Sequence, residues 1–92
     1  MSTYHELKVW PEFFNAINRG DKTFEVRMND RDFKQGDYLT LREWNPDTGL
    51  FTGRLLVRYV TYIMDGNDIG IKCGYVVMGL RQRDSFPITN LQ

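Results

Sequence analysis

The sequence predicts an α+β domain, a small β-barrel of about five mainly antiparallel strands with one helix near the N-terminus. Only one stretch has the apolar spacing of a helix, whereas five stretches alternate with the period of two that is typical of strands. The connections between them are short, which favours hairpins over the long crossovers of a parallel sheet. The chain has 92 residues, which is within the length of one domain, so we expect residues 1–92 to form a single domain.

The N-terminal elements are a strand and a short helix. Residues 4–10 alternate, with Leu7 and Val9 on one face, and Pro11 ends this strand. Proline fits the first position of a helix, and the apolar side chains that follow fall on one helical stripe. Gly20 has the place of a C-terminal cap, so we expect a helix of about two to three turns that ends there.

The period of two returns after the helix and predicts four more strands. They cover residues 23–28, 38–44, 51–64 and 75–80. Loops rich in glycine, asparagine and aspartate separate them, as turn chemistry requires. The strand at 51–64 has apolar residues on both faces, which predicts burial on both sides.

The charge balance limits what the protein can bind. Lysine plus arginine is 12 and aspartate plus glutamate is 12, so the net charge is zero and a polybasic coat for nucleic acid is excluded. Any nucleic-acid site must therefore be local. We expect such a site to have modest affinity and a shallow dependence on salt, because few phosphates can be neutralised.

Cysteine usage and motifs exclude several further classes. Cys73 is the single cysteine, so no internal disulfide can form and no paired spacing indicates a zinc site. The N-terminal residues lack the apolar core of a signal peptide, and no apolar run approaches the length of a membrane span. We therefore expect a cytoplasmic protein without a membrane partner. No phosphate loop or dinucleotide fingerprint is present, so no metal or cofactor is predicted.

The densest polar stretch lies at the start of the strand at 23–28. Strand geometry puts Glu25 and Arg27 on one face about 7 Å apart, and Lys22 in the preceding turn can reach the same space. A carboxylate that accepts from a base, beside cations that donate to a phosphate or carbonyl, can read a nucleotide. The alternative is a solvated strand face with an ion pair worth about 0 to 1 kcal/mol.

Other candidates lie outside this strand. His5 and Lys8 can contact a phosphate or a base. For His5, a structural role with a hydrogen bond to the backbone is an equally good interpretation. Aromatic rings that can stack on bases, or simply pack, are Trp10, Trp44 and Tyr38.

Arginines outside this strand give two further candidates. Arg31 can pair with Asp32 to hold the loop after this strand over a ligand bound at Glu25 and Arg27. Arg54 and Arg58 share one strand face and can form a ladder that contacts phosphates, or can be exposed arginines with packed stems.

Several runs of the chain resemble the ASCH domain family of the PUA-like superfamily. The main one is Gly-x-Lys-Thr-x-Glu-x-Arg at residues 20–27, which follows a short helix and precedes Phe-x-x-Gly-Asp-x-Leu-x-Leu at residues 33–41. Three shorter runs are similar to a small ASCH-like family of unknown function from bacteria and phages: His-Glu-Leu-Lys at 5–8, Trp-Pro at 10–11 and Arg-Asp-Phe at 31–33. The resemblance covers nearly the whole chain.

The resemblance implies a PUA-like barrel with a cleft beside the helix and a role related to RNA. By matching position, Lys22, Glu25 and Arg27 would line that cleft. The partner implied is RNA, or a modified nucleotide within it.

Two other function classes stay open. Some small ASCH-like proteins are amidohydrolases that deacetylate acetylcytidine with a threonine nucleophile activated by a lysine, and they are similar to this chain at residues 20–23 and at Arg27. The position of that threonine is Glu25 here, so we expect binding rather than catalysis. The third class is a protein-interaction module, which would present a flat exposed patch rather than a lined concave cleft.

Overall fold

The computed structural model describes residues 2–67 and 69–82. This part of the chain forms one helix and five strands, as the sequence predicts. In chain order they are β1 (Tyr4–Val9), α1 (Pro11–Arg19), β2 (Phe24–Met28), β3 (Tyr38–Asn45), β4 (Leu50–Asp65) and β5 (Tyr75–Gln82). The C-terminal residues 83–92 lie outside the described residues.

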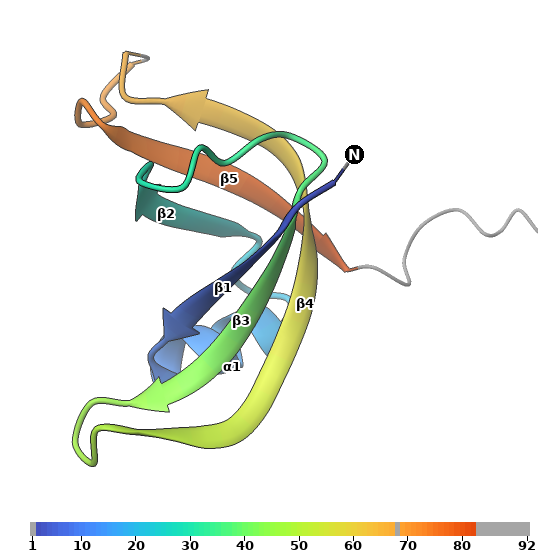
Figure 1. Cartoon of the computed structure of the whole chain (residues 1–92), viewed down its shortest axis with the longest axis vertical. Helices are drawn as coiled ribbons and strands as arrows, with labels where there is room; N and C mark the ends of the chain where they lie inside the picture. The colour runs from blue at the N-terminus through green and yellow to red at the C-terminus, as the bar shows by residue number, and fades with distance from the viewer. Residues whose placement is uncertain (1, 68, 83–92) are drawn as a thin grey trace, which may run out of the picture.

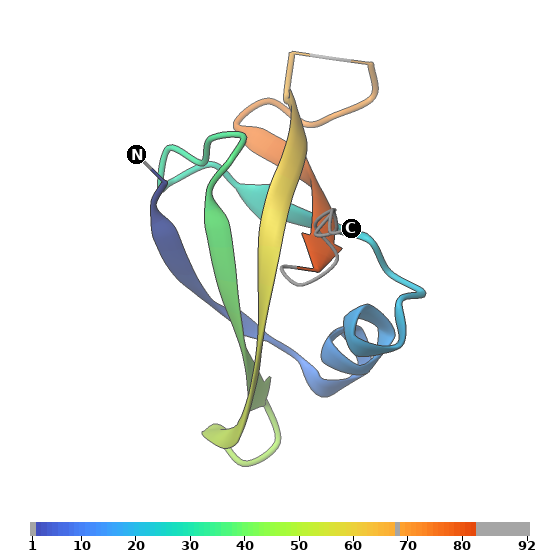
Figure 2. The same cartoon turned by 90° about the vertical axis from the view of Figure 1, so that its right-hand side faces the viewer.

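The five strands form one sheet in the order β1-β3-β4-β5-β2, which curls into a half-barrel (Figures 1 and 2). Three of its four strand pairings are antiparallel, and β1 and β3 are parallel. Register shifts in β3 and β4 interrupt the ladders and increase the local twist, which helps the sheet to curl. The expected barrel is therefore open, with β1 and β2 as its two edges.

Helix α1 begins with Pro11 directly after Trp10 and ends at Gly20. Gly20 has a φ of 88°, and its N–H and that of Asp21 donate to carbonyls of the last helical turn. Phe14 and Ile17 are buried, whereas Phe13 on the predicted stripe is exposed. The helix therefore anchors to the core through two side chains and leaves one ring at the surface.

The core lies between the sheet and the helix. Alternate residues of β1, β3 and β5 enter it, as the period of two predicts. Its buried apolar residues are Leu7, Val9, Phe14, Ile17, Phe33, Leu39, Leu41, Val60, Val76 and Met78.

The expectation that strand β4 is buried on both sides is wrong. Within Leu50–Asp65 only Arg58 and Val60 are buried, and residues 50–55 are all exposed. Sixteen residues of strand span about 53 Å, which is longer than this small core. The first part of β4 therefore continues beyond the core as a hairpin with β3, at the bottom of Figure 1.

Strand β2 places its polar face inward. Glu25 is buried and Arg27 is half-buried, whereas Phe24, Val26 and Met28 are exposed. Alternation alone does not decide which face of this strand turns inward. Glu25 is therefore not on a solvated strand face, whereas the ion pair with Arg27 that this alternative includes is present.

In the described part of the chain, no helix is long and apolar enough to cross a membrane.

Candidate functional site

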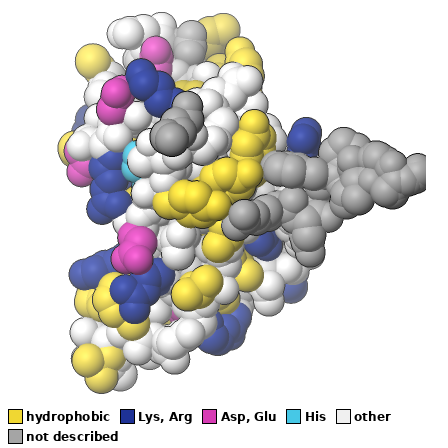
Figure 3. Space-filling view, turned by 45° about the vertical axis from the view of Figure 1, so that its right-hand side comes forward, with side chains coloured by type: hydrophobic (Ala, Val, Ile, Leu, Met, Phe, Trp, Pro, Cys, Tyr) yellow, Lys and Arg dark blue, Asp and Glu magenta, His cyan; other side chains and the backbone are white. Residues whose placement is uncertain are grey.

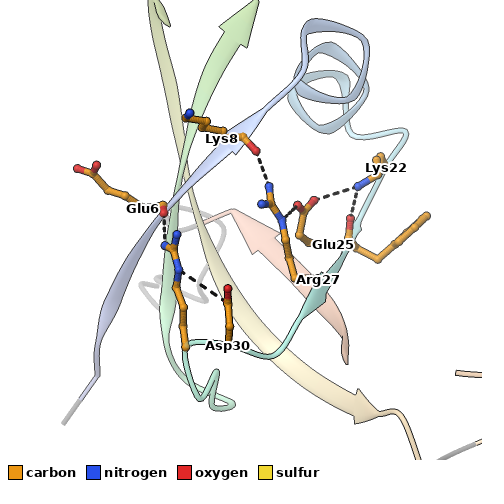
Figure 4. Close-up of polar contacts among 8 residues, drawn as sticks. Glu6, Lys8, Lys22, Glu25, Arg27 and Asp30 are labelled. Atoms are coloured by element: carbon orange, nitrogen blue, oxygen red, sulfur yellow. Dashed lines mark hydrogen bonds and ion pairs between the residues drawn. The ribbon is translucent and has the colours of Figure 1, made fainter. Parts of the chain in front are cut away.

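Glu25 lies at the centre of a small ion-pair cluster on the inner side of β2 (Figure 4). Its side chain is 7% exposed, and each of its oxygens contacts a different cation. Lys22 Nζ lies 3.1 Å from Oε1, and Arg27 Nε donates to Oε2 at 2.6 Å. A buried carboxylate is costly unless charged partners and hydrogen bonds compensate for it, and here both oxygens are satisfied.

Two arginines connect the open edges of the half-barrel. Arg27, on β2, donates through Nη2 to the main-chain oxygen of Lys8 on β1. Arg31, which follows β2, donates through Nη1 to the main-chain oxygen of Glu6. These side chains, which we call the arginine bridge, satisfy carbonyls of an edge strand that the sheet leaves unpaired. The bridge keeps β1 and β2 together without a strand ladder between them.

A groove of about 550 Å³ lies beside this cluster, between the end of β1, the start of α1 and β2. We call it the aromatic groove. Its apolar walls are formed by Val9, Trp10, Phe13, Val26, Met28 and Tyr75. Its polar lining consists of Lys8, Lys22, Glu25 and Arg27.

The rings of the aromatic groove are accessible. Trp10 is 49% exposed, and its ring is stacked on that of Phe13 with the centroids 6.5 Å apart. The Lys22 ammonium lies 5.8 Å from the Phe13 centroid and donates to the main-chain oxygen of Phe24. Two of its three N–H donors thus have protein acceptors, and the third can reach a ligand.

This geometry combines flat apolar walls with cationic donors at one place. Such a groove can hold a planar ring between aromatic and aliphatic side chains and can bind a carbonyl or anion. The carboxylate of Glu25 holds both cations in position. Thr23, a hydroxyl two residues before Glu25 on the same strand face, does not line the aromatic groove in the described structure.

Comparison with known proteins identifies the family. The sequence profile of a family described as a domain of unknown function (DUF3850) matches residues 4–80, which is most of the chain. The chain belongs to the DUF3850 family. A relative from Escherichia phage P2, named "Uncharacterized 12.9 kDa protein in GpA 3'region", is 37% identical over 68 residues. That match covers 74% of this chain and 61% of the phage protein.

These comparisons bear on the expected resemblance. The family of unknown function and the phage relative match the coarser part of that resemblance, which is its unknown function and its occurrence in phages. The match includes every strand and helix up to Leu80, and with them the aromatic groove.

Lys8 and Trp10 lie with the motif residues in this DUF3850 domain. Both line the aromatic groove beside Lys22, Glu25 and Arg27. The Lys8 ammonium also lies 4.6 Å from the ring of Trp44, which is half-buried. Two of the rings considered for stacking, Trp44 and Tyr38, do not line the groove in the described structure.

His5 lies elsewhere and has a buried partner. Its Nε2 lies 2.8 Å from Oδ2 of Asp37. The same carboxylate accepts the N–H of Lys34 at Oδ2 and the N–H of Thr3 at Oδ1. Burial alone would raise the pKa of Asp37, but these hydrogen bonds outweigh it and hold the pKa below its ordinary value of 3.8. The pair lines a separate hollow of about 510 Å³ and joins the N-terminal strand to the turn before β3. This placement fits a structural histidine.

The remaining arginines do not form the arrangements that the sequence raised. Arg58 is 8% exposed and donates to the carbonyls of Val57 and Ile17, so it cannot form a phosphate ladder with Arg54. Arg54 instead contacts Asn15 and Glu43 beside the helix, away from the groove.

Arg31 does not pair with Asp32. Its Nε lies 4.0 Å from Asp30, while Asp32 pairs with Lys34. Arg31 is still near the site, because it forms half of the arginine bridge.

Sequence reasoning missed several walls of the groove. Phe13, Val26 and Met28 look like core positions, and only the direction in which β2 faces shows that they are exposed. Tyr75 lines the groove because β5 pairs antiparallel with β2, which places Tyr75 opposite Met28. A usable signal was present, because an alternating strand whose polar face carries balanced charges can bury that face.

Proposed function

We propose that this protein is an ASCH-like module of the PUA-like type that binds RNA, or a nucleotide within RNA, in the aromatic groove. The observation that carries the proposal is the buried carboxylate of Glu25, held between Lys22 and Arg27 at the base of a groove with aromatic walls. The ASCH-like motif residues thus converge at one concave place. A flat exposed patch would favour a protein partner instead.

Each lining residue then has a role in the proposed complex. Trp10 and Phe13 offer ring faces for a base, and Met28 offers a flexible apolar contact opposite them. Lys22 and Arg27 donate to a base carbonyl or to a phosphate oxygen. Glu25 positions both cations, and its remaining lone pairs can accept from a base amino group.

The amidohydrolase alternative has less support. In the similar amidohydrolases, a threonine nucleophile has the position of Glu25. Here that position carries a carboxylate, and both of its oxygens contact cations. Thr23 lies outside the aromatic groove, and its main-chain oxygen accepts from Leu80 in the sheet. No observation in the described residues favours catalysis over binding.

The test is fluorescence anisotropy with labelled single-stranded RNA, matched single-stranded DNA and a hairpin RNA. We expect RNA binding that Arg27→Ala weakens by about tenfold, because a charge-assisted donor is lost. Trp10→Ala should weaken binding at least fivefold, since stacking on one base is worth about 1 to 3 kcal/mol. Trp10 provides no side-chain cap to α1, so this change leaves the start of the helix intact.

The matched control is Arg19→Ala, which removes an exposed arginine paired only with Asp21 at the end of α1. It should bind like the unchanged protein. Circular dichroism verifies that each variant is folded. Absence of binding to all three probes, or binding that both groove substitutions leave unchanged, overturns the proposed function.

A further inference from the structure

A second hollow of about 410 Å³ lies next to the aromatic groove and gathers positive charge. We call it the basic groove. Its cations are Lys8 on β1, Arg27 on β2, Arg31 after β2 and Arg42 on β3, and Glu6 is the carboxylate among its described lining residues. Arg27 is also paired with Glu25, and Arg31 lies 4.0 Å from Asp30, so the four cations face three nearby carboxylates and keep one net positive charge in a chain whose overall net charge is zero.

Two of these cations have donors to spare. Arg42 Nη1 lies 3.6 Å from Glu6, which is too long for a hydrogen bond, and no other described acceptor contacts its side chain. Its guanidinium lies over the ring of Phe51, with Cζ 3.9 Å from the ring centroid, and this cation–π contact favours that position. Lys8 lies over Trp44 and has no described carboxylate within ion-pairing distance.

The other two cations shape the wall of the basic groove. Arg27 and Arg31 donate to the main-chain oxygens of Lys8 and Glu6, so the arginine bridge holds β1 in place at this point. Their remaining N–H donors and their positive charge still face the groove. The site is therefore organised before any ligand arrives, which reduces the entropy that binding costs.

The two grooves meet. Lys8 and Arg27 line both of them, so a ligand can extend from one into the other. Along the left-hand side of Figure 3, lysine and arginine side chains lie beside hydrophobic side chains, and acidic side chains lie between the upper and lower basic groups. A ligand that fits both grooves has a flat ring at one end and an anion at the other.

We propose that the basic groove is a phosphate subsite, in which a nucleotide whose base lies in the aromatic groove places its phosphate. Arg42 supplies a forked pair of donors and Lys8 supplies a point charge, the two ways in which proteins bind phosphate. A phosphate accepts hydrogen bonds from several directions, which suits cations that converge from β1, β2 and β3. The identity of the ligand rests on the proposed function, whereas the subsite rests on the basic groove itself.

The experiment is an NMR titration of backbone amides with inorganic phosphate, uridine and uridine monophosphate as separate probes. We expect inorganic phosphate to shift amides around Glu6, Lys8 and Arg42, and uridine to shift amides around Trp10 and Met28. Uridine monophosphate should shift both sets and bind at least fivefold more tightly than uridine.

Arg42→Gln should remove the phosphate shifts and reduce the advantage of the monophosphate, while uridine binding stays unchanged. Lys8→Gln is a second variant that keeps the main-chain oxygen used by Arg27. The matched control is Arg19→Gln, which changes an arginine outside both grooves.

The outcomes separate the two proposals. If uridine and its monophosphate bind equally and Arg42→Gln has no effect, the phosphate subsite is overturned while the proposed function stands. If inorganic phosphate binds at the basic groove but uridine produces no shifts, the subsite stands and the base-binding function fails. If a tetraglutamate peptide binds as tightly as the monophosphate with the same dependence on Arg42, the groove accepts acidic peptides and the phosphate assignment is wrong.

Discussion

Glu25 holds two cations, Lys22 and Arg27, with its two carboxylate oxygens. Burying a carboxylate costs several kcal/mol unless its partners compensate. Its partners Lys22 and Arg27 are partly exposed, so they can turn to water when the carboxylate is removed. Replacement of Glu25 by alanine would therefore release both cations, and an effect on binding would not separate contact from positioning. Trp10 is the cleaner probe of the groove, because Arg27 also forms part of the arginine bridge and is paired with Glu25.

Asp37 makes the free energy of unfolding depend on pH. Its pKa lies below the ordinary value of 3.8, so its ionised form stabilises the fold. This contribution is fully present above about pH 4 and is lost as the pH falls through the lowered pKa. We expect Asp37→Asn to reduce the free energy of unfolding by about 2 kcal/mol at pH 7, because a buried charged acceptor is lost. The difference from the unchanged protein should shrink below pH 3.8. Urea denaturation at several pH values measures it.

An exposed aspartate serves as the control for this titration. Asp21 pairs with Arg19 at the surface, where such ion pairs contribute about 0 to 1 kcal/mol. Asp21→Asn should change stability little at any pH. A stability difference for Asp37→Asn that stays constant from pH 7 to pH 2.5 would show that the carboxylate is not the stabilising form.

At the scale of elements, the end of α1 determines where Lys22 enters the groove. Gly20 has a φ of 88°, and the N–H groups of Asp21 and Lys22 both donate to the carbonyl of Ala16. A side chain at position 20 would meet no atom within 4 Å, so the cost of Gly20→Ala is the backbone conformation alone. We expect a loss of about 1 kcal/mol in the free energy of unfolding, measured by urea denaturation.

Asparagine provides the matched comparison, because it tolerates the left-handed conformation better than alanine does. Gly20→Asn should therefore lose clearly less stability than Gly20→Ala. Equal losses would indicate a steric cause, and no loss for alanine would contradict the left-handed cap.

The helix and the strands were largely predictable from local sequence pattern, but the buried face of β2 was not. Alternation located all five strands, and Pro11 and Gly20 located the ends of the helix. Alternation cannot say which face of β2 is buried, because both faces are regular. The choice depends on Lys22 and Arg27 compensating Glu25, which is a property of three side chains in space. The parallel pairing of β1 with β3 also depends on the whole sheet, and the short connections pointed to hairpins instead.

At the scale of the molecule, the candidate site could be predicted only in part. The motif Lys22, Glu25 and Arg27 was visible in sequence, and Lys8 and Trp10 join it at the groove. The separation of His5 and Arg54 from the groove was not visible, since the curl of the sheet decides which strands approach each other. Arg42 carried no motif and becomes a candidate only because β3 lies beside β1.

The net charge of zero, together with the basic groove, predicts how RNA binding should respond to salt, given the proposed function. The 12 basic and 12 acidic residues provide no long-range attraction, so only local cations such as Lys8, Arg31 and Arg42 can neutralise phosphates. About three phosphates on a single strand give a slope of about −2 in log affinity against log salt. Affinity should therefore fall about twentyfold between 50 and 200 mM salt, as measured by anisotropy.

The same local site limits the length of RNA that contributes to binding. Both grooves lie on a molecule of 45 × 34 × 26 Å and share two lining residues, so they can engage only a few nucleotides. An oligonucleotide of about six nucleotides should bind nearly as tightly as one of twelve, within the range of site sizes known for small single-strand binders. A slope steeper than about −4, or affinity that keeps rising with length, would require an extended phosphate-binding surface. The described charge distribution, with its cations gathered at one junction between β1, β2 and β3, does not provide such a surface.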